Sequence, residues 1–225
     1  PWTYKNPLKH PAPVVQTKDW PVNFIDYFIL SQLEKVALSP SPDTDPVTLL
    51  RRLNFDLTGL PPTPADRDRF LSSFKTNPQI AIEAEVDRLL KSPHFGERLA
   101  SYWLDLVRYA DTVGYHGDQD HNISPYRDYV IRAFNENMPF DRFTREQLAG
   151  DLFPHPTQQQ LVATGYNRLL QTTHEGGLQQ AEYRAIYQAD RVRNVSAVWM
   201  GATVGCAQCH DHKYDPYTAK DFHTL

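Results

Sequence analysis

The sequence lacks the features that several classes of protein require. It has only two cysteines, three positions apart, which excludes a disulfide-rich scaffold. No apolar run approaches the roughly 20 residues of a membrane-spanning helix. Lys plus Arg number 23 and Asp plus Glu number 27, so the net charge of -4 gives no sign of nucleic-acid binding. With 40% hydrophobic and 22% charged residues, the chain is not expected to be disordered.

The ends of the chain also lack the signals of natural termini. The sequence begins without methionine, and it stops within about a turn of a helix start at Thr218. We therefore expect a piece of a longer protein, or a processed chain, and the missing signal peptide says nothing about localisation. Residues 1–21 carry five prolines and are predicted to form an extended linker or strap. Residues 22–225 are predicted to form a single domain, which is long enough to bury a sizeable core.

Helical periodicity dominates from residue 22 onward. One apolar face is formed by Phe24, Ile25, Phe28, Ile29 and Leu33. A capping residue followed by proline recurs as a helix-start signal at Asp45-Pro46, Thr63-Pro64, Ser92-Pro93 and Ser124-Pro125. Further helices are predicted over 79–91, 139–149 and 157–170.

The longest helical pattern runs from about Gln179 to Thr203, and no segment alternates as a strand does. We predict an all-α, irregular multi-helix domain of about eight or nine helices. Trp199, on the apolar stripe of the long helix, is expected to pack in the core close to the end that carries the chemistry described next.

The long helix leads into Cys206-Ala207-Gln208-Cys209-His210, which is a C-x-x-C-H motif. This spacing is typical of covalent haem c attachment. Two thiols one turn apart can form thioethers to the two vinyl groups of one macrocycle, and the adjacent imidazole then binds the iron. Cys206, Cys209 and His210 are therefore predicted to hold one covalent haem c, with His210 as the iron ligand.

Three other interpretations of the cysteine pair stay open. A zinc site would use Cys206, Cys209, His210 and His212, which are too crowded to wrap one tetrahedral ion easily. A thioredoxin-like redox pair would require a βαβ context, whereas this region has a helical pattern. The pair could also form an inert disulfide or remain as free thiols.

The second axial ligand is not given by the motif. The candidates are His116, His121, His155, His174, His212, His223, Met138 and Met200. Among them we favour His174, which lies in a glycine-bounded loop just before the long helix. An open sixth position is an equal alternative.

Three further groups have a functional and an ordinary interpretation. Asp118-x-Asp120-x-Asn122 resembles the start of a calcium loop, but Ile123 occupies the position that needs glycine. Arg108 would pair with Asp105 on one helix, or with a haem propionate or an anionic substrate. The Nδ1–H of His210 would be held by the Asp211 carboxylate or, more commonly in proteins, by a backbone carbonyl.

Six stretches of the chain form a specific set of motifs. They are residues 24–30 (FIDYFIL), 51–64 (RRLNFDLTGLPPTP), 102–111 (YWLDLVRYAD), 126–129 (YRDY), 146–151 (EQLAGD) and 206–216 (CAQCHDHKYDP). Together they resemble the planctomycete-type PSCyt domain, which typically lies between a cytochrome c-like domain and a C-terminal partner domain. The resemblance covers about residues 20–225. It implies an exported protein of a larger multidomain architecture, and it names no substrate.

These observations predict an exported c-type haem domain that transfers electrons within a larger multidomain protein or assembly. Covalent haem attachment implies a periplasmic or extracellular location, and the expected partner is a redox protein or a neighbouring cytochrome domain. One alternative is a haem oxidoreductase, peroxidase-like, with an open distal site. Another is a structural or interaction module without haem.

Overall fold

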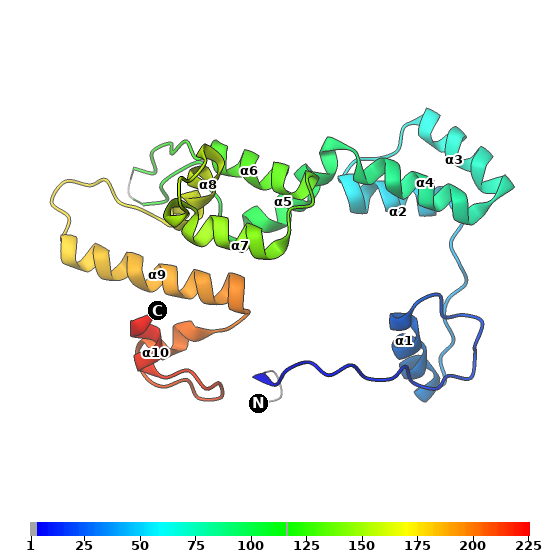
Figure 1. Cartoon of the computed structure of the whole chain (residues 1–225), viewed down its shortest axis with the longest axis horizontal. Helices are drawn as coiled ribbons and strands as arrows, with labels where there is room; N and C mark the ends of the chain where they lie inside the picture. Colours follow the sequence, from blue (N-terminus) through cyan, green and yellow to red (C-terminus); the bar gives the residue numbers. More distant parts are fainter. Residues whose placement is uncertain (1–3, 116) are drawn as a thin grey trace. The chain divides into compact units, whose positions relative to one another are not determined.

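The structure is a computed structural model, and it describes residues 4–115 and 117–225. Within these residues there are ten α-helices and no strand, so the predicted all-α class is confirmed. The only strand-like pairings among them are two isolated bridges, Thr112 with Asp120 and Gly114 with Thr172. The chain divides into two compact units, Pro1–Asp45 and Pro46–Leu225, which are described separately (Figure 1).

The first unit contains one helix, α1 (Phe24–Lys35), which begins with a capping box between Asn23 and Asp26. The described part of the predicted linker, residues 4–21, lies in this unit and is tied to the helix. The backbone N–H of Gln16 donates to the Glu34 carboxylate at 3.0 Å, and that of Thr17 at 3.1 Å. The segment is thus held against the end of α1 at this point.

The second unit begins with three helices, α2 (Pro46–Thr58), α3 (Pro64–Thr76) and α4 (Pro78–Leu90). Their apolar faces meet at Leu50, Phe70 and Ala81, which are all buried. The predicted start at Thr63-Pro64 is a full capping box, in which Thr63 and Asp66 each accept from the other's backbone. Asn77-Pro78 carries the same kind of signal at the start of α4.

The main core is formed by α5 (Pro93–Leu106), α6 (Ser124–Asn135), α7 (Phe140–Ala149) and α8 (Gln158–Ala163). Gly96 allows α5 and α6 to approach closely, because a Cβ there would lie 2.3 Å from the Ile131 carbonyl oxygen. A buried polar network joins three of these helices. Trp103 Nε1 donates to the Tyr126 hydroxyl at 3.1 Å, and that hydroxyl donates to Gln147 Oε1 at 2.6 Å.

One predicted cap and one predicted helix end are wrong. Helix α6 begins at Ser124-Pro125 as predicted, but Ser124 does not cap it, since its side chain donates to Asn122 Oδ1 at 2.8 Å and no side chain caps that helix. The helix predicted over 157–170 ends at Ala163. It is followed by a 3₁₀ helix, η3 (Thr164–Arg168), and another short one, η2 (Gly150–Leu152), follows α7.

The long helix α9 (Gln180–Met200) packs on two different groups of residues. Val195, Val198 and Trp199 contact the main core, whereas Ala189 and Val192 contact a smaller cluster formed with the C-terminal segment. Because α9 serves two clusters, its apolar residues do not form a single stripe. Trp199 packs in a core, as predicted, but that core is the α5–α7 cluster and not the one around the cysteines.

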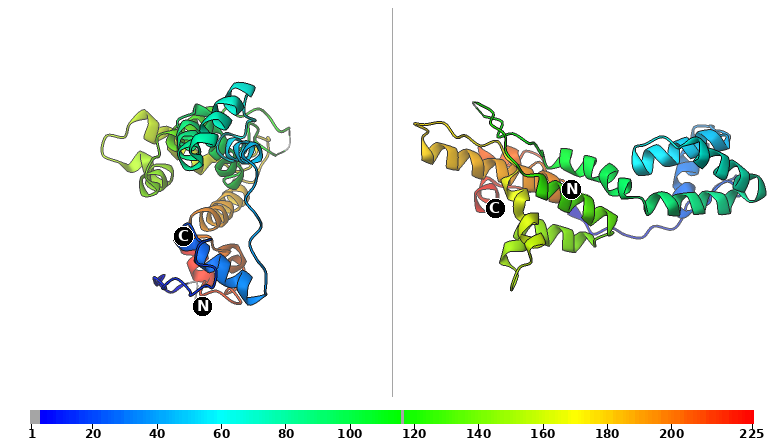
Figure 2. Two further views of the ribbon diagram at one scale, coloured as in Figure 1. Left: turned by 90° about the vertical axis from the view of Figure 1, so that its right-hand side faces the viewer. Right: turned by 90° about the horizontal axis from the view of Figure 1, so that it is seen from above.

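The chain reverses direction directly after α9. Gly201 ends the helix with φ +59°, a left-handed conformation that glycine adopts at low cost. The 3₁₀ helix η4 (Val204–Gln208) and α10 (Ala219–Thr224) then fold back along α9 (Figures 1 and 2). Thr218 and Asp221 form the capping box expected at the start of α10. No helix of the described residues is long and apolar enough to cross a membrane.

Candidate functional site

Cys206 lies within η4, and Cys209 is the residue directly after that helix. Side chains three positions apart in a 3₁₀ helix lie above one another. Val204 and Ala207, one such pair, are fully buried against the C-terminal cluster. Cys206 and Cys209, also three positions apart, are exposed and not joined to each other. With Val204 and Ala207 buried, both cysteines are left accessible to solvent.

His210 follows the second thiol and is also exposed. Its Nδ1 lies 2.8 Å from the backbone carbonyl oxygen of Asp211, so Nδ1 carries the proton and donates it there. This tautomer leaves Nε2 with a lone pair and with no hydrogen-bond partner among the described residues. The Asp211 carboxylate has a different task, because it accepts the backbone N–H of Ala219 at 2.8 Å. The more common of the two predicted arrangements, a backbone carbonyl, is the one present.

His212 is a structural residue. Its Nδ1 accepts the backbone N–H groups of Asp215 at 2.8 Å and Tyr214 at 3.2 Å. Nε2 lies 3.4 Å from the Thr203 hydroxyl. The side chain is only 10% exposed. His212 therefore holds the loop after the motif in place, and its ring nitrogens are not available to a metal.

The zinc interpretation loses support from this arrangement, because His212 was its fourth ligand. In the part of the chain that the structure describes, no three His, Cys, Asp or Glu side chains gather so that they could hold a metal ion. Asp118, from the partial calcium motif, instead accepts the backbone N–H of Gly114 at 2.7 Å. Hydrogen bonds from Thr112 and Gly114 hold the pKa of this carboxyl below its usual range, as expected for a turn-forming aspartate.

The structure does not bring His174 to the motif. His174 precedes α9, whereas η4 folds back against the second half of that helix, where Arg193 donates a hydrogen bond to Gln208. The 13 residues between Gln180 and Arg193 span about 20 Å of helix. His174 lies instead in a cavity with His121, which the motif residues do not line. A role for His174 as distal ligand has no geometric support.

The other candidate ligands are also dispersed. Met138 packs against the main core, His155 is exposed in a loop, and Met200 is half-exposed at the last residue of α9. His116 lies outside the described residues. His223 is the one candidate in contact with the motif, since its Nε2 lies 3.3 Å from the Gln208 carbonyl oxygen.

A cavity of about 510 Å³ lies between α9 and α10, beside the motif. Gln208, His223, Phe222 and Val192 are among its lining residues, whereas Cys206, Cys209 and His210 are not. The proximity of His223 was not predicted, since it depends on the fold-back of α10, for which the sequence has no signal. The thiols themselves face solvent and not this cavity.

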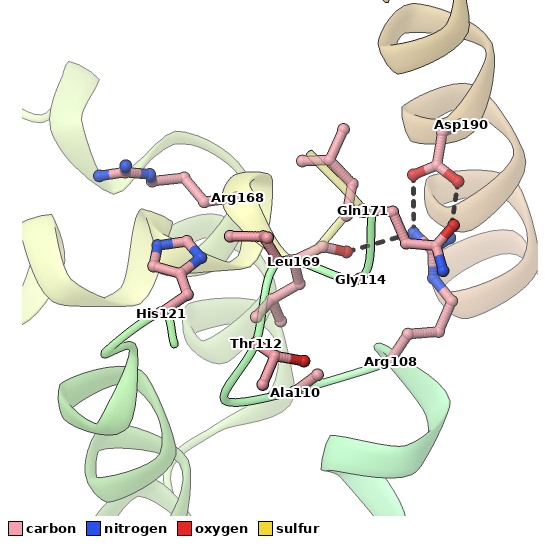
Figure 3. A pocket seen from close by; sticks show the side chains of 11 residues that line it. Arg108, Ala110, Thr112, Gly114, His121, Arg168, Leu169, Gln171 and Asp190 are labelled. Atoms are coloured by element: carbon pink, nitrogen blue, oxygen red, sulfur yellow. Dashed lines mark hydrogen bonds and ion pairs between the residues drawn. The ribbon is translucent and has the colours of Figure 1, made fainter. Parts of the chain in front are cut away.

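Arg108 has a partner that the sequence did not indicate. Its side chain forms no ion pair with the Asp105 carboxylate, and its guanidinium instead meets both carboxylate oxygens of Asp190 on α9, at 2.6 and 2.9 Å. It also donates to the Leu169 carbonyl oxygen at 3.3 Å (Figure 3). Arg108 adopts φ +63°, an uncommon conformation for a residue with a side chain. The pair links the end of α5 to α9.

With the geometry described, the family of the chain can be stated. The model of the PSCyt2 family, described as a protein of unknown function (DUF1549), matches residues 24–225. The chain belongs to the PSCyt2 family. No curated protein and no solved structure shows significant similarity to it. Membership of PSCyt2 supports the resemblance seen in the sequence and assigns no activity.

Proposed function

We propose that this PSCyt2 chain is an exported c-type haem domain that transfers electrons within a larger multidomain protein. The observation that carries the proposal is the C-x-x-C-H motif, whose two cysteines are both free and exposed at η4 and the residue after it. The proposed partner is a redox protein or a neighbouring cytochrome domain. The periplasmic or extracellular location is part of the same proposal.

The residues of the motif fit the attachment of a haem. Cys206 and Cys209 are unpaired and reach solvent from adjacent turns, so each could form one thioether. His210 has Nε2 free for the iron, and its Nδ1–H bond to the Asp211 carbonyl would raise the donor strength of the ring. A bound haem would supply one-electron redox chemistry.

One observation favours a second candidate, the haem oxidoreductase with an open distal site. Of the described candidate ligands, only His223 contacts the motif, and its Nε2 already lies within hydrogen-bond distance of Gln208. No side chain is therefore placed ready to act as the sixth ligand. An open sixth position is the arrangement that a peroxidase-like activity requires.

Expression in a host that attaches haem in its periplasm tests the proposal. Intact-mass analysis of the unmodified chain should show one added haem that survives acid–acetone extraction. The Cys206→Ser and Cys209→Ser variants should each lack one of the two thioethers. His174→Ala is the matched control, and it should leave attachment unchanged. A bare polypeptide mass from such a host would contradict the proposal. The remaining interpretation would then be a structural or interaction module without haem.

The optical spectrum then separates the two haem candidates. A low-spin reduced spectrum that carbon monoxide leaves unchanged supports electron transfer. A high-spin spectrum that carbon monoxide or peroxide alters supports the oxidoreductase. His210→Ala should change the spectrum in either case, because the axial nitrogen is removed.

A further inference from the structure

A second candidate site lies away from the motif, where two loops meet the first half of α9 (Figure 3). Two adjoining cavities there, of about 380 and 620 Å³, share the lining residues Val113, His121, Arg168 and Leu170. Neither cavity is lined by a residue of the C-x-x-C-H motif. An inference about this site therefore stands apart from the proposed haem.

The backbone fixes the two loops to each other and to α9. Thr172 donates its backbone N–H to the Val113 carbonyl at 2.9 Å, and Thr173 donates to the Tyr187 hydroxyl on α9 at 2.8 Å. His121 is held by its backbone N–H, which donates to the Asp111 carbonyl at 2.7 Å. The side chains that line the cavities thus project from a defined framework.

Asp190, the acidic residue of α9 that lines the smaller cavity, is already neutralised by Arg108. Both carboxylate oxygens of Asp190 accept hydrogen bonds from Arg108, at 2.6 and 2.9 Å. The bidentate geometry is the strong form of an arginine–carboxylate pair. Asp190 is therefore occupied, and it does not balance the other arginines of the site.

Two arginines remain without a carboxylate partner. The side chain of Arg168, the last residue of η3, makes no hydrogen bond or ion pair with any described residue. Figure 3 shows it on the same side of the cavity as His121, away from the Arg108–Asp190 pair. Arg191 on α9 uses only Nε, which donates to the Asn167 carbonyl oxygen at 3.2 Å. Its two terminal nitrogens have no acceptor in the described part of the chain.

The remaining polar groups of the larger cavity are mainly donors. The Tyr187 hydroxyl accepts the Thr173 N–H, so its own hydrogen is left to donate. The imidazoles of His121 and His174 line the same cavity, and each can donate from one nitrogen. Asp120 is the single carboxylate among the residues that line this cavity. With two arginines against this one carboxylate, positive charge exceeds negative charge in the lining.

We propose that this cavity binds the oxyanion group of a small molecule, a phosphate, sulfate or carboxylate, through Arg168 and Arg191. A guanidinium matches the spacing of two oxygens on such a group, and neither arginine has to leave a carboxylate in order to bind it. The Tyr187 hydroxyl supplies a neutral donor to the same group. The Arg108–Asp190 pair holds α9 against the loops so that the donors converge.

Calorimetric titration of the whole chain with inorganic phosphate, sulfate or acetate, at constant ionic strength, tests the proposal. At least one of the three should bind saturably, and the preferred anion identifies the class of ligand. Arg168→Gln should weaken that binding at least about tenfold, because a charge-assisted hydrogen bond is lost. The Arg168 side chain is exposed and forms no hydrogen bond or ion pair with a described residue, so its substitution should leave the melting temperature nearly unchanged.

Arg52→Gln is the matched control, since Arg52 is an exposed arginine of α2 without a partner among the described residues. This variant loses the same charge and should bind the anion as the unmodified chain does. Equal weakening in both variants would show that only net charge matters, and it would overturn the proposal. So would the absence of saturable binding for all three anions. Either result would leave the haem proposal untouched.

Discussion

His210 and His212 lie two positions apart, and the structure gives them different tasks. His210 keeps one nitrogen free at an exposed position, whereas His212 uses Nδ1 to accept two backbone N–H groups. The difference arises from the loop between Asp211 and Tyr217, which closes around the His212 ring. The sequence shows the two histidines as equivalent members of one motif.

We expect substitution of His212 to affect mainly the stability of the chain, and substitution of His210 to affect mainly the proposed iron ligation. His212→Ala should lower the free energy of unfolding by about 1–3 kcal/mol, because two backbone N–H groups lose their acceptor. His210→Ala, its matched control, should change the stability of the haem-free chain by less than about 0.5 kcal/mol. Chemical denaturation of both variants measures this difference. Equal losses would contradict the roles assigned here.

The parts of the site that depend on residues close in sequence could be predicted, whereas the parts that depend on distant residues could not. The C-x-x-C-H motif and the capping box at Thr218 are local patterns, and both could be read from spacing. The partner of Arg108 could not, because Asp190 is 82 positions away and competes with the nearby Asp105. The contact of His223 with the motif depends on the fold-back after Gly201, which local patterns do not specify.

Among the elements, α3 and α4 are held together by a charged cluster at one edge. Glu85 is 4% exposed and accepts hydrogen bonds from Arg69 and Arg88. Burial alone would raise the pKa of Glu85, but the two arginines outweigh it and hold the pKa below its usual value. The pKa of Asp66 is lowered to about 2, first by the Thr63 hydroxyl and then, against the effect of burial, by Arg69.

This cluster predicts a loss of stability in acid. A carboxylate with a lowered pKa in the folded state stabilises the fold above its unfolded pKa, and that contribution is lost as the pH falls through the folded pKa. For Asp66 the window runs from 3.8 down to about 2. We expect Asp66→Asn to cost about 1 kcal/mol at pH 7 and only a small part of that at pH 2, after allowance for solvent screening.

Urea unfolding at several pH values measures the effect. Asp68→Asn is the control, because Asp68 lies on the same helix with its side chain 68% exposed. The control should show a smaller cost and a weaker pH dependence. If both variants follow the same pH profile, the capping box does not supply this stability.

The helix starts show why element boundaries were only partly predictable. A capping residue before proline correctly marks α3 and α5, where Thr63 and Ser92 accept backbone N–H groups. At Ser124 the pattern marks the start of α6 correctly, but the serine does not cap the helix, since its hydroxyl donates to Asn122. Whether the serine caps the helix depends on competition from a neighbouring side-chain amide, and that amide lies outside the two-residue pattern.

At the scale of the whole second unit, α9 connects two clusters. The ring centre of Trp199 lies 5.0 Å from the ring centre of Trp103 and 5.7 Å from that of Tyr166. Ala189 and Val192 on the same helix support η4. The position of the cysteines relative to the main core therefore depends on α9.

Trp199→Ala should cost about 3–5 kcal/mol of unfolding free energy. Met200→Ala, a substitution at the next residue, is the matched control, since Met200 is 48% exposed and should cost much less. Thermal unfolding gives the comparison. An equal melting temperature for the two variants would refute the role of α9 as the link between the clusters.

The outward position of the two thiols has a consequence for the order of maturation. The loop that carries them is closed by backbone bonds to His212 and by the burial of Val204 and Ala207, none of which involves a cysteine sulfur. The polypeptide can therefore complete its fold first and be modified afterwards. During that interval the exposed thiols are open to oxidation in an oxidising compartment. Under the proposed haem attachment in an exported chain, a reductant that keeps this pair ready for modification would have to act on the folded protein and not only on the nascent chain.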